Sequence, residues 1–255
     1  MKPVQCDELE ECKLPRKEFT LKPSPYPTFA RWWSLCRKYP NLSVLRKMEY
    51  EKLENLSFSG NVLDFGGGLK SPYGTLMKGD FRIESINIDS SIEPTYLVES
   101  GEVFPIEDEK YDFVVSFNTL EHVYDPLFAL GEIFRVLKAG GVAYIAVPFI
   151  FRIHAHPDDY LRATPSWWIE SLKRTGFISC EISPLVWGRG ITANSISSGT
   201  SLLPRKCQVH LLAVLDIFNH CIRHYFTKSY YEKFYDRIVS VSQGWFIEIR
   251  KDESI

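Results

Sequence analysis

The sequence predicts an α/β protein in which helices cover both faces of a doubly wound, largely parallel sheet. Two observations carry this prediction. From residue 60 onward, short apolar segments alternate with amphipathic helical segments along the chain, and strands that alternate with helices form parallel sheets. The segment YDFVVSFN, at residues 111–118, is an almost unbroken apolar run, which is typical of a strand buried on both faces.

Seven strands are expected, at residues 61–65, 81–89, 95–100, 111–118, 141–149, 177–187 and 244–251. Two helices have clear signals. One begins after Asp125 and runs to Lys138, followed by a turn at Ala139-Gly140-Gly141; the other spans about 164–175, with Thr164 as its N-cap. Each has an N-cap residue followed by proline, the usual start of a helix.

The chain divides, by pattern, into an N-terminal arm with helices at residues 1–55 and a sheet domain at residues 56–255. The first part is a candidate lid. Within it Trp32 and Trp33 are adjacent, so we expect one to be buried and the other exposed. Residues 188–204 read as a Gly/Ser-rich loop and 205–240 as one or two helices. Together, residues 190–240 form a helical insertion before the last strand.

Composition narrows the class of protein. The chain is 45% hydrophobic and 24% charged, with a net charge of −2. These values fit a globular domain and argue against a nucleic-acid-binding surface, which is usually basic. The six cysteines show no C-x-x-C spacing, and no apolar run reaches membrane-spanning length. We therefore expect a cytoplasmic protein with free thiols, whose region 205–240 is either core packing or a homodimer or membrane-surface contact.

The sharpest functional signal is the segment Val62-Leu63-Asp64-Phe65-Gly66-Gly67-Gly68, directly after a strand. Glycines at such a point let the backbone approach a ligand closely. The Asp64 carboxylate can accept hydrogen bonds from an ammonium group or from backbone N–H groups of the loop. The dinucleotide fingerprint would need a further glycine at position 71, where Ser71 stands.

Asp89 ends the second expected strand, about 20 residues past the glycines, where an acid can bind ribose hydroxyls. It can instead cap the following helix. A third segment, Asn118-Thr119-Leu120-Glu121-His122, follows the buried fourth strand, so its side chains should line the same cleft.

Taken in order, VLDFGGG, INID, SFNTLEHVYDP and EIFRVLKAGGVAYIAVP resemble the class I S-adenosylmethionine-dependent methyltransferases. The resemblance covers about residues 60–186 and the last strand. It implies a seven-stranded Rossmann-like sheet whose last strand is antiparallel and lies beside the fifth. It also implies S-adenosylmethionine as cofactor, with its methionyl end held by Asp64, Gly66, Gly67 and Gly68 and its ribose by Asp89.

By the same resemblance, Asn118 and Leu120 would flank the methionyl chain, and the loop at residues 99–102 would lie by the adenine. Many relatives carry an acid where this chain has Ser100, with Glu99 and Glu102 as neighbours. Some quinone-pathway relatives bind a divalent metal through an acid at position 118 together with Glu121 and His122. Because Asn118 removes one carboxylate, we expect no metal, and Glu121 and His122 to hydrogen-bond within the cofactor cleft.

A fourth segment, at residues 148–164, follows the fifth strand and is rich in histidine, aspartate and arginine. It resembles an H-x-x-P-x-D-Y-x-R-x-T stretch of bacterial methyltransferases. Histidine has a pKa suited to general-base work, so we expect His154, then His156, to act as base, with Asp159 orienting it. Tyr160 and Arg162 would bind the acceptor. A local ion pair between Asp159 and Arg162 that only orders the loop is the other interpretation.

The sequence therefore predicts a methyltransferase that acts on a small molecule, with a sugar or glycan-precursor hydroxyl as the favoured acceptor. An NAD-dependent oxidoreductase and a non-catalytic cofactor-binding module are the competing hypotheses.

Overall fold

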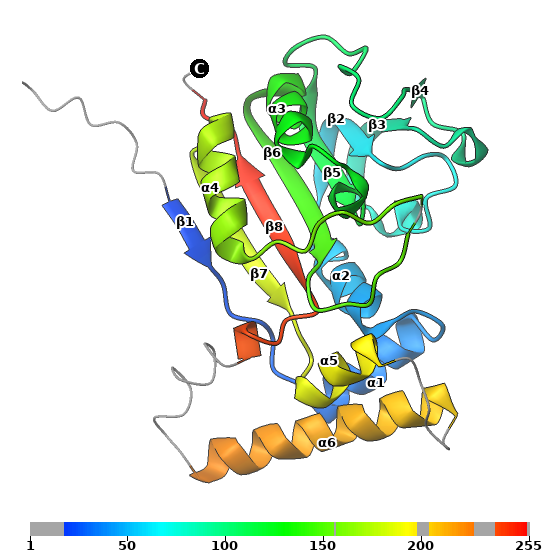
Figure 1. The fold of residues 1–255 in the computed structure, drawn as a ribbon, viewed down its shortest axis with the longest axis vertical. Coiled ribbons are helices and arrows are strands. Elements are labelled where there is room, and N and C mark those ends of the chain that lie inside the picture. The colour runs from blue at the N-terminus through cyan, green and yellow to red at the C-terminus, as the bar shows by residue number, and fades with distance from the viewer. Residues whose placement is uncertain (1–17, 156, 198–203, 227–237, 254–255) are drawn as a thin grey trace, which may run out of the picture.

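The computed structural model describes residues 18–155, 157–197, 204–226 and 238–253. Its centre is an eight-stranded sheet with the order β1-β7-β8-β6-β5-β2-β3-β4 (Figure 1). The strands are β1 (Glu18–Leu21), β2 (Phe58–Phe65), β3 (Gly79–Asn87), β4 (Tyr96–Leu97), β5 (Tyr111–Phe117), β6 (Leu137–Pro148), β7 (Ser179–Leu185) and β8 (Gly244–Arg250).

All seven expected strands are present, and β8 runs antiparallel between β6 and β7, as the resemblance implied. The sheet has one strand more than the seven expected. Residues 18–21 add β1 in parallel to the edge strand β7, and Phe19 packs against the core from there. An ion pair of 2.6 Å between Lys22 and Glu181 lies at the same edge. The sequence analysis had placed this short segment in the N-terminal arm and expected no strand there.

Six α-helices accompany the sheet among the described residues: α1 (Phe29–Lys38), α2 (Val44–Leu53), α3 (Pro126–Val136), α4 (Pro165–Thr175), α5 (Arg189–Ile196) and α6 (Arg205–Phe226). The caps of two of them are as expected. The side chain of Asp125 accepts the N–H of Phe128, and that of Thr164 accepts the N–H of Trp167. These caps satisfy N–H groups that have no partner within the helix.

The end of α3 differs from the expectation. The helix stops at Val136, and Lys138 with the glycines that follow belongs to β6. The Lys138 ammonium pairs with the Asp112 carboxylate on the neighbouring strand at 2.8 Å. Gly140 has a φ of +74°, so it supplies a bend inside the strand where a separate turn was expected.

Each face of the sheet carries its own apolar core. Helices α3 and α4 cover one face, where Trp168 and Trp245 are buried. Helix α2 covers the other, in the core that also holds Trp32 of α1 and Trp187. As expected, Trp32 is buried while its neighbour Trp33 is 74% exposed.

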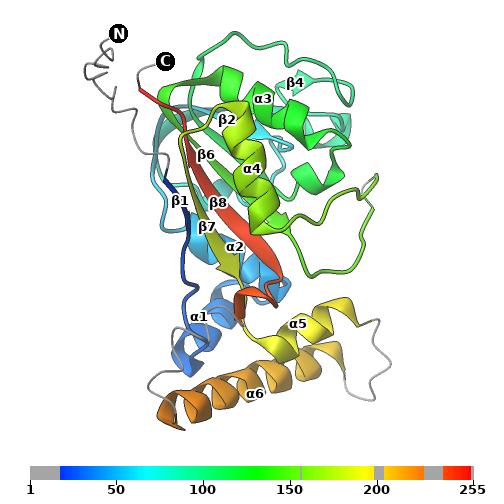
Figure 2. The same ribbon diagram turned by 60° about the vertical axis from the view of Figure 1, so that its left-hand side comes forward.

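Helices α5 and α6 follow β7 and lie at one end of the molecule, next to α1 (Figures 1 and 2). Residues 189–196, expected as loop, form α5, and the buried Asp216 of α6 accepts the N–H groups of Gly190 and Ile191 at 2.9 Å each. Part of the expected helical region, residues 227–237, lies outside the described residues. Every helix in the described ranges is too short or too polar to span a bilayer.

Candidate functional site

The predicted site residues gather at the carboxyl ends of β2, β3, β5 and β6. From β2 the sheet continues to β3 and β4 on one side and to β5 and β6 on the other. The strand order therefore reverses beside β2, and ligands of open α/β sheets bind at such a point.

The Gly66–Gly68 loop leaves β2 at this position and has no room for side chains. Gly66 has a φ of +91°, a conformation that favours glycine. A Cβ on Gly67 would lie 1.8 Å from the Asp64 Oδ2, and one on Gly68 would lie 2.4 Å from the carbonyl oxygen of Ile92. The φ of Gly66 and the close contacts at Gly67 and Gly68 thus favour glycine at all three positions.

Asp64 is buried beneath this loop. Tyr73 donates its hydroxyl to Asp64 Oδ1 at 2.7 Å, and Ser71 donates to Oδ2 at 3.3 Å. Ser71 also accepts the N–H of Gly68 at 2.9 Å. Burial raises the pKa of Asp64 to about 7, against the lowering effect of the two hydroxyl donors. Asp64 therefore holds the glycine loop in place through the side chains of Ser71 and Tyr73. The sequence analysis missed Tyr73 and read Ser71 only as a missing glycine.

Asp89 lies half-buried just after β3 and accepts the N–H of Ser91 at 2.8 Å. The capping contact that the sequence left open is thus present, and it leaves Asp89 at the strand end where ribose binding was expected. Its neighbour Asn87 donates to the carbonyl oxygen of Gly66 at 2.6 Å, which ties β3 to the glycine loop. In the expected adenine loop, Glu102 accepts the N–H of Glu99 at 3.0 Å.

Asn118 follows β5 in a left-handed conformation, with a φ of +55°. Its side-chain amide donates to Glu49 of α2 at 2.7 Å, and Arg46 pairs with the same carboxylate at 3.0 Å. Burial raises the pKa of Glu49, while Arg46 and the amide lower it. Leu120, two residues on, is fully buried. No motif marked Arg46 and Glu49, because only the packing of α2 brings them to this strand end.

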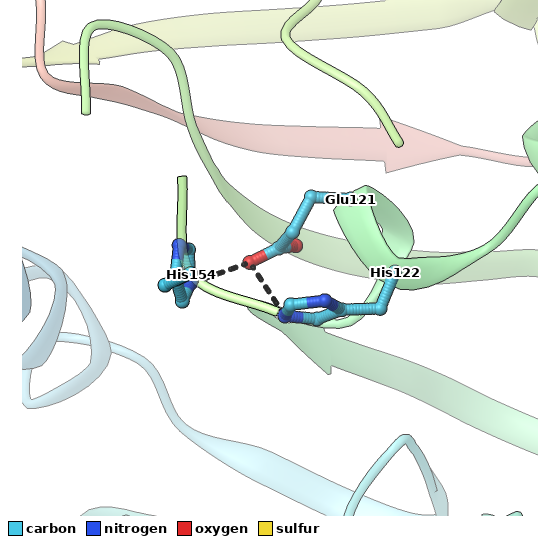
Figure 3. Close-up of side chains that lie close together, drawn as sticks. All are labelled: Glu121, His122 and His154. Carbon is cyan, nitrogen blue, oxygen red and sulfur yellow. Dashed lines mark ion pairs between the residues drawn. The ribbon is translucent and has the colours of Figure 1, made fainter. Parts of the chain in front are cut away.

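Glu121 lies between two imidazoles (Figure 3). Its Oε1 is 3.6 Å from His122 Nε2 and 3.9 Å from His154 Nε2. Glu121 is 1% exposed, and neither carboxylate oxygen has a hydrogen-bond partner among the described residues. Burial raises the pKa of Glu121 to about 8, although Arg162 lowers it. The hydrogen bonds expected for Glu121 are therefore not found, because both imidazoles lie beyond hydrogen-bond distance.

His154 comes from the segment after β6, which folds back against Glu121 and His122, just beyond the end of β5. The His154 N–H donates to Asp159 Oδ2 at 2.9 Å, and both terminal nitrogens of Arg162 donate to the Asp159 carboxylate at 2.5 Å. Burial lowers the pKa of His154, while Asp159 raises it. The loop-ordering ion pair is thus present, and Asp159 positions both Arg162 and the His154 backbone.

The remaining residues of this segment are more exposed. Tyr160 is 51% exposed and donates its hydroxyl to Asp158 at 3.0 Å. The Tyr160 N–H donates to the carbonyl oxygen of Glu121 at 2.8 Å, while the His122 ring contacts the Asp158 carbonyl oxygen. His156 lies outside the described residues.

One potential ligand atom each from Glu121, His122 and His154 lies within 4.8 Å of the others, so these three residues can converge on one ion. His154 adds the third potential metal ligand; the sequence analysis had predicted it to be the general base. Asn118, where metal-binding relatives carry an acid, turns its amide to Glu49 instead. The cluster therefore holds a single acid.

The sheet, with its antiparallel last strand and a glycine loop at the reversal of strand order, defines the class I methyltransferase fold. A protein of Haloferax volcanii, solved in complex with the Trm112 methyltransferase activator, shares this fold with a TM-score of 0.51 and 16% identity over 88% of this chain and 95% of that one. Residues 79–145 match the family described as "Methyltransferase domain". The fold and this match are those of the class I S-adenosylmethionine-dependent methyltransferases that the sequence motifs resemble.

Two curated relatives are similar over part of the chain. An uncharacterized 37.1 kDa protein in a transposon of Streptomyces fradiae is 30% identical across 56% of this chain and 46% of its own length. A Mycolicibacterium smegmatis protein, named a probable S-adenosylmethionine-dependent methyltransferase, is 28% identical across 39% of this chain and 42% of its own. This chain thus spans about half the length of the curated relatives it matches.

Proposed function

We propose that this protein transfers a methyl group from S-adenosylmethionine to a hydroxyl of a small molecule, with a sugar or glycan precursor as the favoured acceptor. The observation that supports the donor is the glycine loop at the reversal of strand order. Gly67 and Gly68 lie so close to Asp64 and Ile92 that only bare backbone fits there.

The residues at this strand edge fit such a donor. Gly66 and Gly68 would hold its amino-acid end, Asp64 would keep their loop in shape, and Asp89 at the end of β3 would bind the ribose. Asn118 and Leu120 would line the space between the amino-acid end of the donor and its ribose. When bound, the cofactor supplies an electrophilic methyl group on a sulfonium; the protein aligns the acceptor and excludes water.

On the acceptor side, His154 would take the proton of the hydroxyl as that oxygen attacks. Its lowered pKa keeps the imidazole neutral at neutral pH and able to accept a proton. The resulting imidazolium would be stabilised by the Asp159 carboxylate, whose Oδ2 lies 3.5 Å from His154 Nδ1. Tyr160, half-exposed beside this group, would contact the acceptor, and Arg162 would hold Asp159 in place.

The N-terminal helices would complete the cleft. Glu49 of α2 holds the amide of Asn118, so the helices α1 and α2 would act as a cover over the methionyl end and the sheet domain as the catalytic unit. Free thiols at Cys36, Cys180, Cys207 and Cys221 support a reducing, cytoplasmic setting.

Calorimetric titration with S-adenosylhomocysteine, and separately with NAD, tests the donor. We expect the first to bind and the second not to bind, and Asp89→Ala to weaken the first by about tenfold or more, as for a lost pair of buried hydrogen bonds. Binding of NAD alone would favour the oxidoreductase.

A labelled-methyl screen over sugar nucleotides, phenols and amines tests the acceptor. His154→Ala should lower kcat and leave the affinity for S-adenosylhomocysteine unchanged. Unaltered turnover would remove His154 from the reaction, and binding of the donor product without turnover on any acceptor would favour the non-catalytic module.

A further inference from the structure

Helix α6 has apolar side chains on the face that points away from the protein. Its buried side consists of Ala213, Asp216, Ile217 and His220. The opposite side carries an apolar stripe of side chains that are between 47% and 84% exposed: Leu211, Leu215, Phe218, Ile222 and Tyr225. Their alternating spacing of four and three residues places them in one line along the helix.

The stripe continues onto α1. The Phe29 ring lies 5.8 Å from that of Phe218, in an edge-to-face arrangement. Trp33 follows one turn later on the same face of α1 and is 74% exposed. This joined surface, which we call the α6 surface, comprises the apolar stripe with Phe29 and Trp33. Monomeric proteins rarely expose apolar side chains in such a contiguous group unless the group binds something.

The charges of α6 indicate what that partner is. Arg205, Lys206 and Arg223 are exposed and basic, whereas the only acid of the helix, Asp216, is buried and accepts two backbone N–H groups. A second copy of α6 would bring these cations against one another in a parallel arrangement and in an antiparallel one. An anionic surface complements them in every orientation.

We propose that the α6 surface binds the face of an anionic lipid bilayer, with α6 lying in the plane of the interface. Basic residues beside an apolar helical stripe are the pattern of interfacial helices, and Trp and Tyr are enriched at the headgroup level. Figures 1 and 2 show α6 as the outermost element at this end of the molecule. Since β7 enters α5 at its carboxyl end, this is the same end of the sheet as the candidate site.

Vesicle flotation of the full chain tests this proposal. The probes are vesicles of phosphatidylcholine alone and of phosphatidylcholine mixed with phosphatidylglycerol. We expect the protein to float with the mixed vesicles and to lose this at high salt, because the cationic contribution is screened. Leu215→Glu and Ile222→Glu should each lower the partition coefficient about tenfold or more. The double variant Arg205→Glu, Lys206→Glu should lower it by a factor of about 20 or more, from roughly 1 kcal/mol for each lost cation.

The matched control is Leu127→Glu, on α3, where the side chain is 40% exposed and outside the α6 surface. It should float like the unaltered protein. All the substituted side chains are exposed, so folding should survive, and thermal unfolding curves check this. Equal flotation of Leu215→Glu and the control would overturn the proposal. So would absence of flotation together with a concentration-dependent dimer that Leu215→Glu disrupts, which would assign the surface to a second copy.

Discussion

Substitution of Glu121 by Gln should change how the stability of the protein depends on pH. Glu121 is 1% exposed, and its pKa is raised from 4.5 to about 8 by burial. The unfolded chain ionises this group first, so stability is fully present below about pH 4.5 and falls as the pH rises toward 8. A rise of the Glu121 pKa from 4.5 to about 8 lowers the free energy of unfolding by an amount on the order of 5 kcal/mol over that pH range.

Glutamine has nearly the same shape and does not titrate. We expect Glu121→Gln to match the unaltered protein within about 1–2 kcal/mol near pH 5 and to be the more stable protein near pH 8. Urea unfolding followed by tryptophan fluorescence across this range measures the difference. The variant must be compared with the unaltered protein at each pH. Asp64, with a pKa of about 7, makes the free energy of unfolding of both proteins fall with rising pH in the same direction.

Glu132→Gln is the matched control. Glu132 is also buried, but it pairs with Arg135 at 2.7 Å and accepts the N–H of Phe104, and its pKa is lowered, first by Arg135. Its contribution is present above its unfolded pKa and is lost in acid, so this variant should be less stable than the unaltered protein at neutral pH. A Glu121→Gln difference that stays flat from pH 5 to 9 would refute the assignment of Glu121 as a buried, unpartnered acid.

Three further predictions concern the cleft. Gly67→Ala should abolish binding of S-adenosylhomocysteine in calorimetry, because its Cβ would lie 1.8 Å from the Asp64 Oδ2; binding within twofold of the unaltered protein would show that the loop yields. Tyr73→Phe should cost about 1–3 kcal/mol in urea unfolding at neutral pH and raise the pKa of Asp64, since the acid loses its donor at 2.7 Å; an unchanged unfolding midpoint would contradict this. The purified protein should contain no stoichiometric divalent metal by elemental analysis, because Asn118, which stands where the metal-binding relatives carry an acid, donates its amide to Glu49; a bound metal that Glu121→Gln removes would reverse that prediction.

Local chemistry determined much of the fold in advance. The caps at Asp125 and Thr164 act over three residues, and the apolar run of β5 reflects its own burial, so both could be predicted from neighbouring residues. Where two signals competed, the prediction was wrong. Lys138 suits the end of a helix, but its ion pair with Asp112 and the pairing of Leu137 with Tyr111 belong to the sheet.

The sequence by itself determined which strand ends carry polar side chains, because the alternation of strands and helices places the carboxyl ends of parallel strands at one edge. Only the tertiary structure decided which side chains meet there. Glu49 reaches Asn118 across 69 positions in the chain, and His154 reaches Glu121 across the gap between two strand ends. Such contacts depend on how α2 and the segment after β6 pack on the sheet. That packing depends on the summed burial of many apolar residues, and no short motif records it.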